Sequence, residues 1–343
     1  MTDVLRDTLS GPSEPGDVEA QYRALIDACG LTLRRDRRFV RIRGDRRAEM
    51  LNGLVTNEVL GLADAGRHAM LLTAKGRVLT DMRVFPEADA LLLEVPDAGL
   101  TNLLATFKRY LPPIYATFEN VSESLAQIGL YGPQAAAAAV ELTGGEPPAG
   151  THGCREMDLD GGPALIVRER RLPVDGIELT VLSAGLGVLA ERALAACEAL
   201  GGRPAGLEAL DVLRVEAGLP AYGRDMDERV LAQETGLEDA ISHDKGCYLG
   251  QEVVARIHFR GHVNRTLRGL EFDDETADAG AALRDDDKQV GQVTSSVESP
   301  DLGPIGLGYV RREVEPGARL GWSAGDREGE ATVRALPFRL GDL

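Results

Sequence analysis

Residues 245–252 read KGCYLGQE, and the chain continues as VVARIHFRG over residues 253–261. The apolar residues of this continuation have helical spacing, which predicts a helix over 251–259. Cys247 would then lie just before the helix N-terminus and two residues from Lys245, where exposed backbone N–H groups and a cation both favour the thiolate. From composition alone, a buried and inert cysteine in a turn is an equally good interpretation.

Upstream of this segment, the hydrophobic pattern alternates between strands and helices, which predicts an α+β fold to about residue 265. The loop at 144–150 separates two groups of elements. In the first group we expect helices over 18–29, with Gly30 as C-cap, over 45–60, with Asp45 as N-cap, and near 97–110, and strands over 38–43, 69–73, 77–85 and 90–95. In the second group we expect strands over 163–168 and 176–182 and helices over 186–200 and 206–217.

The pattern of hydrophobic and polar residues changes after Arg265. Short alternating pieces such as LRGLEF, QVGQVTSS and IGLGYVRR recur, with Gly, Pro and Asp between them. This pattern is typical of a small all-β barrel or sandwich.

Composition sets broad limits on the function. The 343 residues are enough for two or three domains, and 55 acidic against 38 basic residues give a formal charge of −17. Such a chain repels phosphate backbones on average, so extensive nucleic-acid wrapping is disfavoured. The four scattered cysteines, an N-terminus without an apolar run and the lack of a long apolar stretch predict a cytoplasmic protein with no membrane segment.

Two clusters have more than one interpretation. Residues 34–47 are rich in arginine, which fits either an anion site or, as we favour, a solvated strand face. His243, Cys247, His258 and His262 are ligand types for zinc or iron, but Gly261 interrupts the spacing, so solvent-facing histidines around a turn are favoured and no metal is expected.

KGCYLGQE followed by ARIHFRG closely resembles the signature of the YgfZ family, the folate-binding relatives of the glycine-cleavage T protein, an aminomethyltransferase. Three other segments are similar to motifs of the wider superfamily. These are GLYGPQA at 129–135, DGIE at 175–178 and LRVEAGLPAYG at 213–223.

The resemblance implies the aminomethyltransferase-like folate-binding fold, with two α+β domains and a C-terminal β-barrel. One α+β domain would be inserted in the sequence of the other. The expected ranges are 1–265 for the folate-binding region, with the second domain at roughly 48–120, and 266–343 for the barrel.

The resemblance also implies tetrahydrofolate, or a one-carbon derivative, as cofactor. Asp81 would act beside N5 of the folate, and Glu178 would accept adjacent pterin N–H donors bidentately. We expect Cys247 to face the same pocket. The implied catalytic residues are Cys247 and Asp81, and the implied folate-binding residues are Glu178, Arg214, Glu216, Tyr222, Lys245 and Gly246.

Two departures from aminomethyltransferases favour the YgfZ-like branch. Residues 76–81 keep one acidic residue where those enzymes carry G-G-I-x-D-D, and Cys247 replaces an acidic residue. We therefore expect a protein that supports iron–sulfur cluster assembly or repair and iron–sulfur-dependent tRNA modification. Its partners would be iron–sulfur enzymes or assembly proteins, and tRNA would be involved only indirectly. We expect no membrane association, and the protein could be monomeric.

Two alternatives stay open. The first is an aminomethyltransferase of the glycine cleavage system, so whether the chain turns over a substrate is left undecided. The second is a non-catalytic scaffold for tRNA or a partner protein, which the negative charge disfavours.

Overall fold

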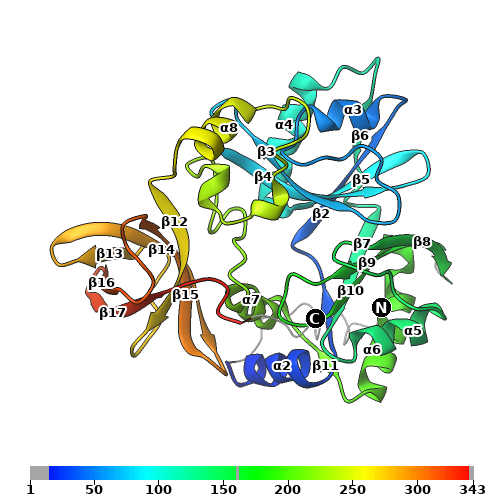
Figure 1. Cartoon of the computed structure of the whole chain (residues 1–343). Helices are drawn as coiled ribbons and strands as arrows, with labels where there is room; N and C mark the ends of the chain where they lie inside the picture. The colour runs from blue at the N-terminus through cyan, green and yellow to red at the C-terminus, as the bar shows by residue number, and fades with distance from the viewer. Residues whose placement is uncertain (1–14, 160–161, 340–343) are drawn as a thin grey trace.

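Two sheets with their helices and a closed barrel surround a common centre (Figure 1). The computed structural model describes residues 15–159 and 162–339. The α+β fold with a C-terminal β-barrel is confirmed, and the barrel follows the two sheets in the chain as expected. Among the helices of the described residues, none is long and apolar enough to span a lipid bilayer.

One sheet has six strands, and in the sequence these strands lie partly before and partly after the segment that forms the second sheet. Its order is β11-β1-β7-β10-β9-β8, and all neighbours are antiparallel except β1 and β11. The strands are β1 (Gly30–Leu33), β7 (Leu125–Tyr131), β8 (Cys154–Leu159), β9 (Gly162–Glu169), β10 (Gly176–Leu182) and β11 (Arg203–Pro204). The chain therefore leaves this sheet after β1 and returns at β7.

The residues between β1 and β7 form a five-stranded antiparallel sheet of order β3-β4-β5-β2-β6. Its strands are β2 (Arg37–Arg43), β3 (Arg67–Leu72), β4 (Val78–Pro86), β5 (Ala90–Pro96) and β6 (Thr117–Asn120). This is the expected insertion of one α+β unit in the other. The inserted sheet begins with β2, which lies before the expected start near residue 48.

Side-chain alternation arranges these elements in layers. On β10, Ile177 and Leu179 point to the helices α5 (Ala135–Thr143) and α6 (Leu186–Ala199), whereas Glu178 points to the opposite face. On β4, Met82 and Val84 point to α3 (Arg47–Asn52) and α4 (Leu100–Tyr110), which follows the short helix η1 (Asp97–Gly99). The inner faces of the two sheets therefore meet, through the apolar cluster that includes Phe39, Phe85, Leu165 and Val167 and through buried polar residues.

The barrel closes with the strand order β12-β15-β14-β13-β16-β17, and β17 pairs back to β12. Its strands are β12 (Arg265–Phe272), β13 (Ala282–Asp285), β14 (Lys288–Ser299), β15 (Gly303–Arg311), β16 (Arg319–Ala324) and β17 (Arg327–Arg334). The helices α2 (Pro15–Asp27) and α7 (Leu207–Glu216) lie between the barrel and the six-stranded sheet (Figure 1).

The KGCYLGQE segment packs on the β3–β4 hairpin. The helix α8 (Gln251–Arg260) follows it, so the expected helix over 251–259 is confirmed. Gly250 has a φ of +87°, and a Cβ there would lie 2.6 Å from the Thr73 carbonyl oxygen. Glycine at this position therefore permits both the turn and the close approach to the hairpin.

The helix expected over 45–60 is wrong in length. Helix α3 begins at Arg47, after Arg46 rather than Asp45 as N-cap, and ends at Asn52 before Gly53. The chain then turns so that the Thr56 N–H donates to the Met70 carbonyl and Val55 bridges to Leu71. Backbone pairing with β3 therefore replaces the continued helix, and Gly30 likewise begins β1 rather than capping a helix.

We predict that Gly250→Ala lowers the unfolding free energy by about 2 kcal/mol or more. A left-handed conformation costs an L-residue about 1–2 kcal/mol, and the contact with the Thr73 carbonyl adds to that cost. Gly246→Ala is the matched control in the same motif, because a Cβ there has no atom within 4 Å. Its effect should stay within about 0.5 kcal/mol. Equal urea midpoints for the two variants would contradict this account.

Candidate functional site

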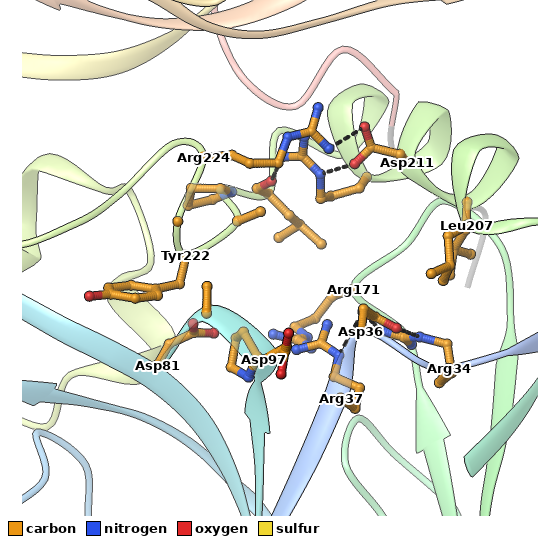
Figure 2. A pocket seen from close by; sticks show the side chains of 18 of the residues that line it. Arg34, Asp36, Arg37, Asp81, Asp97, Arg171, Leu207, Asp211, Tyr222 and Arg224 are labelled. Atoms are coloured by element: carbon orange, nitrogen blue, oxygen red, sulfur yellow. Dashed lines mark hydrogen bonds and ion pairs between the residues drawn. The ribbon is translucent and has the colours of Figure 1, made fainter. Parts of the chain in front are cut away.

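A cavity of about 690 Å³ lies where the two sheets, helix α7 and the segment after it converge. Its wall comes from residues 34–37, β3, β4, 96–98, 169–172 and 207–224. In Figure 2, Asp81 and Tyr222 lie together at one end of the cavity and Leu207 and Arg34 at the other. The volume is in the range of pockets that bind small molecules and cofactors.

Asp81 lines this cavity, and one of its carboxylate oxygens has no hydrogen-bond partner among the described residues. Its Oδ2 lies 3.0 Å from Nε2 of His68, whereas its Oδ1 is buried and has no hydrogen-bond partner among the described residues. Burial raises the pKa of Asp81, but the hydrogen bond and electrostatic attraction of His68 and the charges of Arg37 and Arg171 outweigh it, so the pKa is lowered overall. Asp81 is therefore ionised at neutral pH and can accept a hydrogen bond.

Charged residues of the cavity wall and of the layer behind it join the two sheets. The Arg83 guanidinium contacts Glu94 beside it in the five-stranded sheet, and it also contacts Glu169 and Glu178 of the six-stranded sheet. Arg171 pairs with Glu169 at 2.7 Å. Burial opposes all of these charges, but their mutual attraction keeps the pKa of Arg83 raised and the pKa values of Glu94 and Glu169 lowered. The inner faces therefore carry a closed set of ion pairs.

Glu178 lies within this set and does not reach the cavity. It is fully buried, accepts from Arg34 Nη1 and the Tyr131 hydroxyl, each at 2.5 Å, and also pairs with Arg83. Arg34 lines the cavity and stands between it and Glu178. An open carboxylate for pterin N–H donors was expected at Glu178, but its acceptors are occupied by these neighbours.

Arg214 and Tyr222 line the cavity, as two of the implied folate-binding residues. The Arg214 guanidinium donates to Asp211, Asp225, the Leu219 carbonyl and Ser295 of the barrel. It therefore ties helix α7 to the barrel and to the cavity wall. The Tyr222 hydroxyl accepts from Asn102 at 2.9 Å, so its ring rather than its hydroxyl borders the cavity beside Asp81 (Figure 2).

Glu216 lies outside the cavity lining, at the junction of α7, α2 and the barrel. Its Oε1 accepts from Tyr22 at 2.8 Å and from Ser299 at 2.6 Å, and its buried Oε2 has no hydrogen-bond partner among the described residues. Burial raises the pKa of Glu216, and the two hydrogen bonds offset only part of this effect. The residue joins domains in the structure, whereas a folate contact was expected.

Lys245 and Gly246 also lie outside the cavity lining. The Lys245 ammonium is buried and donates to the carbonyl oxygens of Asn52, Val55 and Asn57 at 2.7, 2.8 and 2.7 Å. Burial lowers its pKa to about 8, while three acceptors favour the ammonium because only this form has three N–H donors. Lys245 thus fastens the signature to the turn before β3.

Cys247 is exposed, whereas Cys29, Cys154 and Cys197 are buried. Cys247 does not line the cavity, because its segment packs on the outer end of the β3–β4 hairpin. The expectation that the thiol faces the folate pocket is therefore not met.

The neighbouring histidines His243 and His258 stack ring on ring at 3.7 Å. Within residues 15–159 and 162–339, no group of three potential metal ligands forms.

The arginine-rich stretch at 34–47 divides into two parts. Arg34, Arg35 and Arg37 line the cavity. The others that have acidic partners pair along the strand and its edges, as Arg38 with Asp97, Arg41 with Glu87 and Arg46 with Glu49. The anion-site interpretation therefore stays a prediction for the cavity-lining part, and the rest of the stretch is a paired, partly solvated strand face.

Sequence reasoning missed His68, Asp36, Arg171, Asp211 and Arg224, all of which line the cavity. No motif contains His68, and its alternation with apolar neighbours in β3 indicates only a strand residue. Arg171 follows β9 in a turn. The partners of both residues are distant in the sequence, so spacing carries no signal for them.

Comparison with known families accounts for nearly the whole chain. Residues 16–245 match the family described as the GCVT N-terminal domain, and residues 265–339 match the glycine cleavage T-protein C-terminal barrel domain. The chain is 30% identical over 333 residues to an aminomethyltransferase of Rubrobacter xylanophilus, covering 95% of this chain and 87% of that protein. It is 34% identical over 280 residues to one of Thermosynechococcus vestitus, covering 79% and 74%.

A solved structure has the same fold. It is the glycine cleavage system aminomethyltransferase T from Bartonella henselae, with a TM-score of 0.85 and 22% identity, covering 96% of this chain and 92% of that one. The arrangement of two α+β domains and a barrel is therefore shared.

We predict that Glu216→Gln stabilises the protein more at pH 7.5 than at pH 4. A group whose folded pKa is raised binds more protons in the folded state, so its contribution to stability is lost as pH rises from about 4.5 through the folded pKa. Glutamine keeps an acceptor for Tyr22 and Ser299 and does not titrate.

The difference in urea midpoint between the variant and the wild type should therefore grow from pH 4 to pH 7.5. A difference that stays constant or shrinks would show that burial does not penalise the Glu216 charge.

Proposed function

Since this chain belongs to the family of the glycine cleavage T-protein, we propose that it binds a reduced folate in the central cavity and transfers an aminomethyl group there. The observation that carries the proposal is the buried, unpartnered Oδ1 of Asp81, a residue that lines a cavity of about 690 Å³. A buried carboxylate oxygen without a partner favours a ligand with an N–H group, because the oxygen otherwise loses its hydrogen bond to water.

The chemistry of the cavity wall is compatible with a folate. Arg35 is exposed at the wall, and Arg37 and Arg224 lie at the same cavity, so cations are available for the anionic glutamate tail. Asp81 can accept an N–H of the ring system. A reduced folate supplies two N–H groups that bind the methylene carbon of the aminomethylated carrier. Their two protons leave with the carrier sulfur, as a thiol, and with the amino group, as ammonia.

One feature of the wall limits this fit. Arg34 covers Glu178, so a pterin ring that contacted this carboxylate would have to displace the guanidinium. The proposal therefore assigns the first ring contact to Asp81, and Glu178 remains a predicted contact.

The residues of this chain would act by binding, orienting and holding a proton. Asp81 accepts the N–H and orients the amine, and it can hold the proton released there because its Oδ1 has no other partner. The Tyr222 ring and Leu237 limit the access of water from the side of the barrel.

We predict that the wild type binds tetrahydrofolate in calorimetric titration and turns over an aminomethylated lipoyl carrier protein. Asp81→Asn should lower turnover by about 10²–10⁴-fold, because the amide cannot take the proton. Asp89→Asn changes the same charge on an exposed turn outside the cavity lining and should leave turnover unchanged. Absence of folate binding by the wild type would refute the proposal, and full turnover by Asp81→Asn would refute the role of Asp81.

A second candidate rests on Cys247. An exposed thiol within a YgfZ-like signature favours a protein that supports iron–sulfur enzymes or their assembly, with an indirect effect on tRNA modification. Because Cys247 lies outside the cavity lining, this function would use a surface separate from the folate site.

Complementation of a bacterial strain that lacks its YgfZ-family protein separates the two candidates. If the second candidate holds, Cys247→Ala should fail to restore iron–sulfur enzyme activity while it accumulates to the wild-type level and keeps carrier turnover. Equal rescue by Cys247→Ala and the wild type would remove the thiol from the function.

A further inference from the structure

We propose that His68 is a positioning residue for Asp81. It would be a neutral imidazole with its proton on Nε2, which donates to Oδ2 and leaves Oδ1 as the unpartnered acceptor for an N–H group of the ligand. This inference rests on the proposed function for the identity of the ligand, but the hydrogen-bond arrangement is a property of the protein alone.

The register of the β3–β4 hairpin brings the two side chains together. His68 lies opposite Arg83, and Met70 lies opposite Asp81, so His68 and Asp81 are diagonal neighbours on the inner face of the sheet. The histidine is almost fully buried, at 2% exposure, and lines the cavity. Both side chains stand on strands rather than loops, which fixes their separation of 3.0 Å.

The second ring nitrogen shows which tautomer this geometry favours. Nη1 of Arg171 lies 3.5 Å from Nδ1 of His68. A guanidinium can only donate, so Nδ1 must present its lone pair to it, and the ring proton belongs on Nε2. An imidazolium would place an N–H against a cation in a buried site. Because Glu169 holds Arg171 at 2.7 Å, the guanidinium is fixed in this position.

Charges on other elements also favour an ionised Asp81. Arg37 of β2 and Arg171, which follows β9, lower the pKa of Asp81 from the cavity side, while the nearby Tyr222 is uncharged. Behind His68 lies His152, with ring centroids 6.3 Å apart. Burial lowers the pKa of His152 to about 2, so this ring is neutral and adds no charge.

This arrangement determines the chemical class of the ligand group. With the imidazole N–H on Oδ2, Oδ1 is the Asp81 oxygen that has no donor among the described residues. An amine or ring N–H fits this acceptor, whereas a carbonyl or carboxylate would be repelled.

Two variants of nearly equal size test the role of His68. In His68→Gln the side-chain amide can donate to Oδ2 as Nε2 does, whereas His68→Leu has no donor and leaves that oxygen unpartnered. Tetrahydrofolate is titrated into the wild type and both variants at pH 7.5 and pH 5.5. Any change in the protonation of tetrahydrofolate between the two pH values is the same for all three proteins, so it cancels when their pH dependences are compared.

Without the donor, the pKa of Asp81 should rise, so more of the carboxylate is protonated at pH 5.5. The loss of tetrahydrofolate affinity from pH 7.5 to pH 5.5 should therefore be at least about tenfold greater for His68→Leu than for the wild type. His68→Gln should follow the wild type within about twofold. An equal pH dependence for His68→Leu and the wild type would overturn the proposal, since a purely structural role would not change this dependence.

The second measurement needs no ligand. Long-range ¹H–¹⁵N spectra of the wild type at pH 7 should show His68 as a neutral ring protonated on Nε2, with His68→Gln identifying its signals. An imidazolium or an Nδ1–H tautomer would overturn the proposal. If this tautomer is found but tetrahydrofolate does not bind, the proposed function fails and the positioning role of His68 stands.

Discussion

The Arg83 guanidinium makes the contact on which the rest of the structure depends. It lies between the inner faces of the two sheets and joins Glu94 of one to Glu169 and Glu178 of the other. Each of these side chains is at most 5% exposed, so water does not stabilise their charges. In such a buried set, removing one partner costs about 3–5 kcal/mol, because the remaining charge has no counter-ion. The relative position of the sheets is therefore set by charge as well as by apolar packing.

The cavity follows from this arrangement. Strand β4, which carries Arg83, also carries Asp81, and the neighbouring strand β3 carries His68. The turn after β9 brings Arg171 against His68. Several residues that resemble a family's ligand contacts instead hold elements together. Lys245 binds a turn and Glu216 joins domains, so the similarity of these motifs reflects shared architecture as much as shared chemistry.

Local patterns in the sequence predicted the strands and helices whose formation depends on residues close to one another in the chain. The alternation over 77–85 corresponds to β4, and the apolar spacing over 251–259 corresponds to α8. Contacts between distant segments were beyond such patterns. The D-G-x-E motif placed Glu178 on a strand, but Arg34, which covers it, is 144 residues away in the sequence. A single histidine in an alternating strand carries no signal, so His68 could be found only once the hairpin register was known.

The Lys245 ammonium binds main-chain oxygens, and this has a consequence for divergence among relatives. Carbonyl groups are present at every position of a polypeptide, so substitutions at Val55 that preserve the path of the turn leave all three acceptors in place. The lysine has no such freedom, since no other side chain supplies three donors from one atom. We therefore expect Lys245 to be retained in homologues even where the sequence of the turn that it binds is no longer similar.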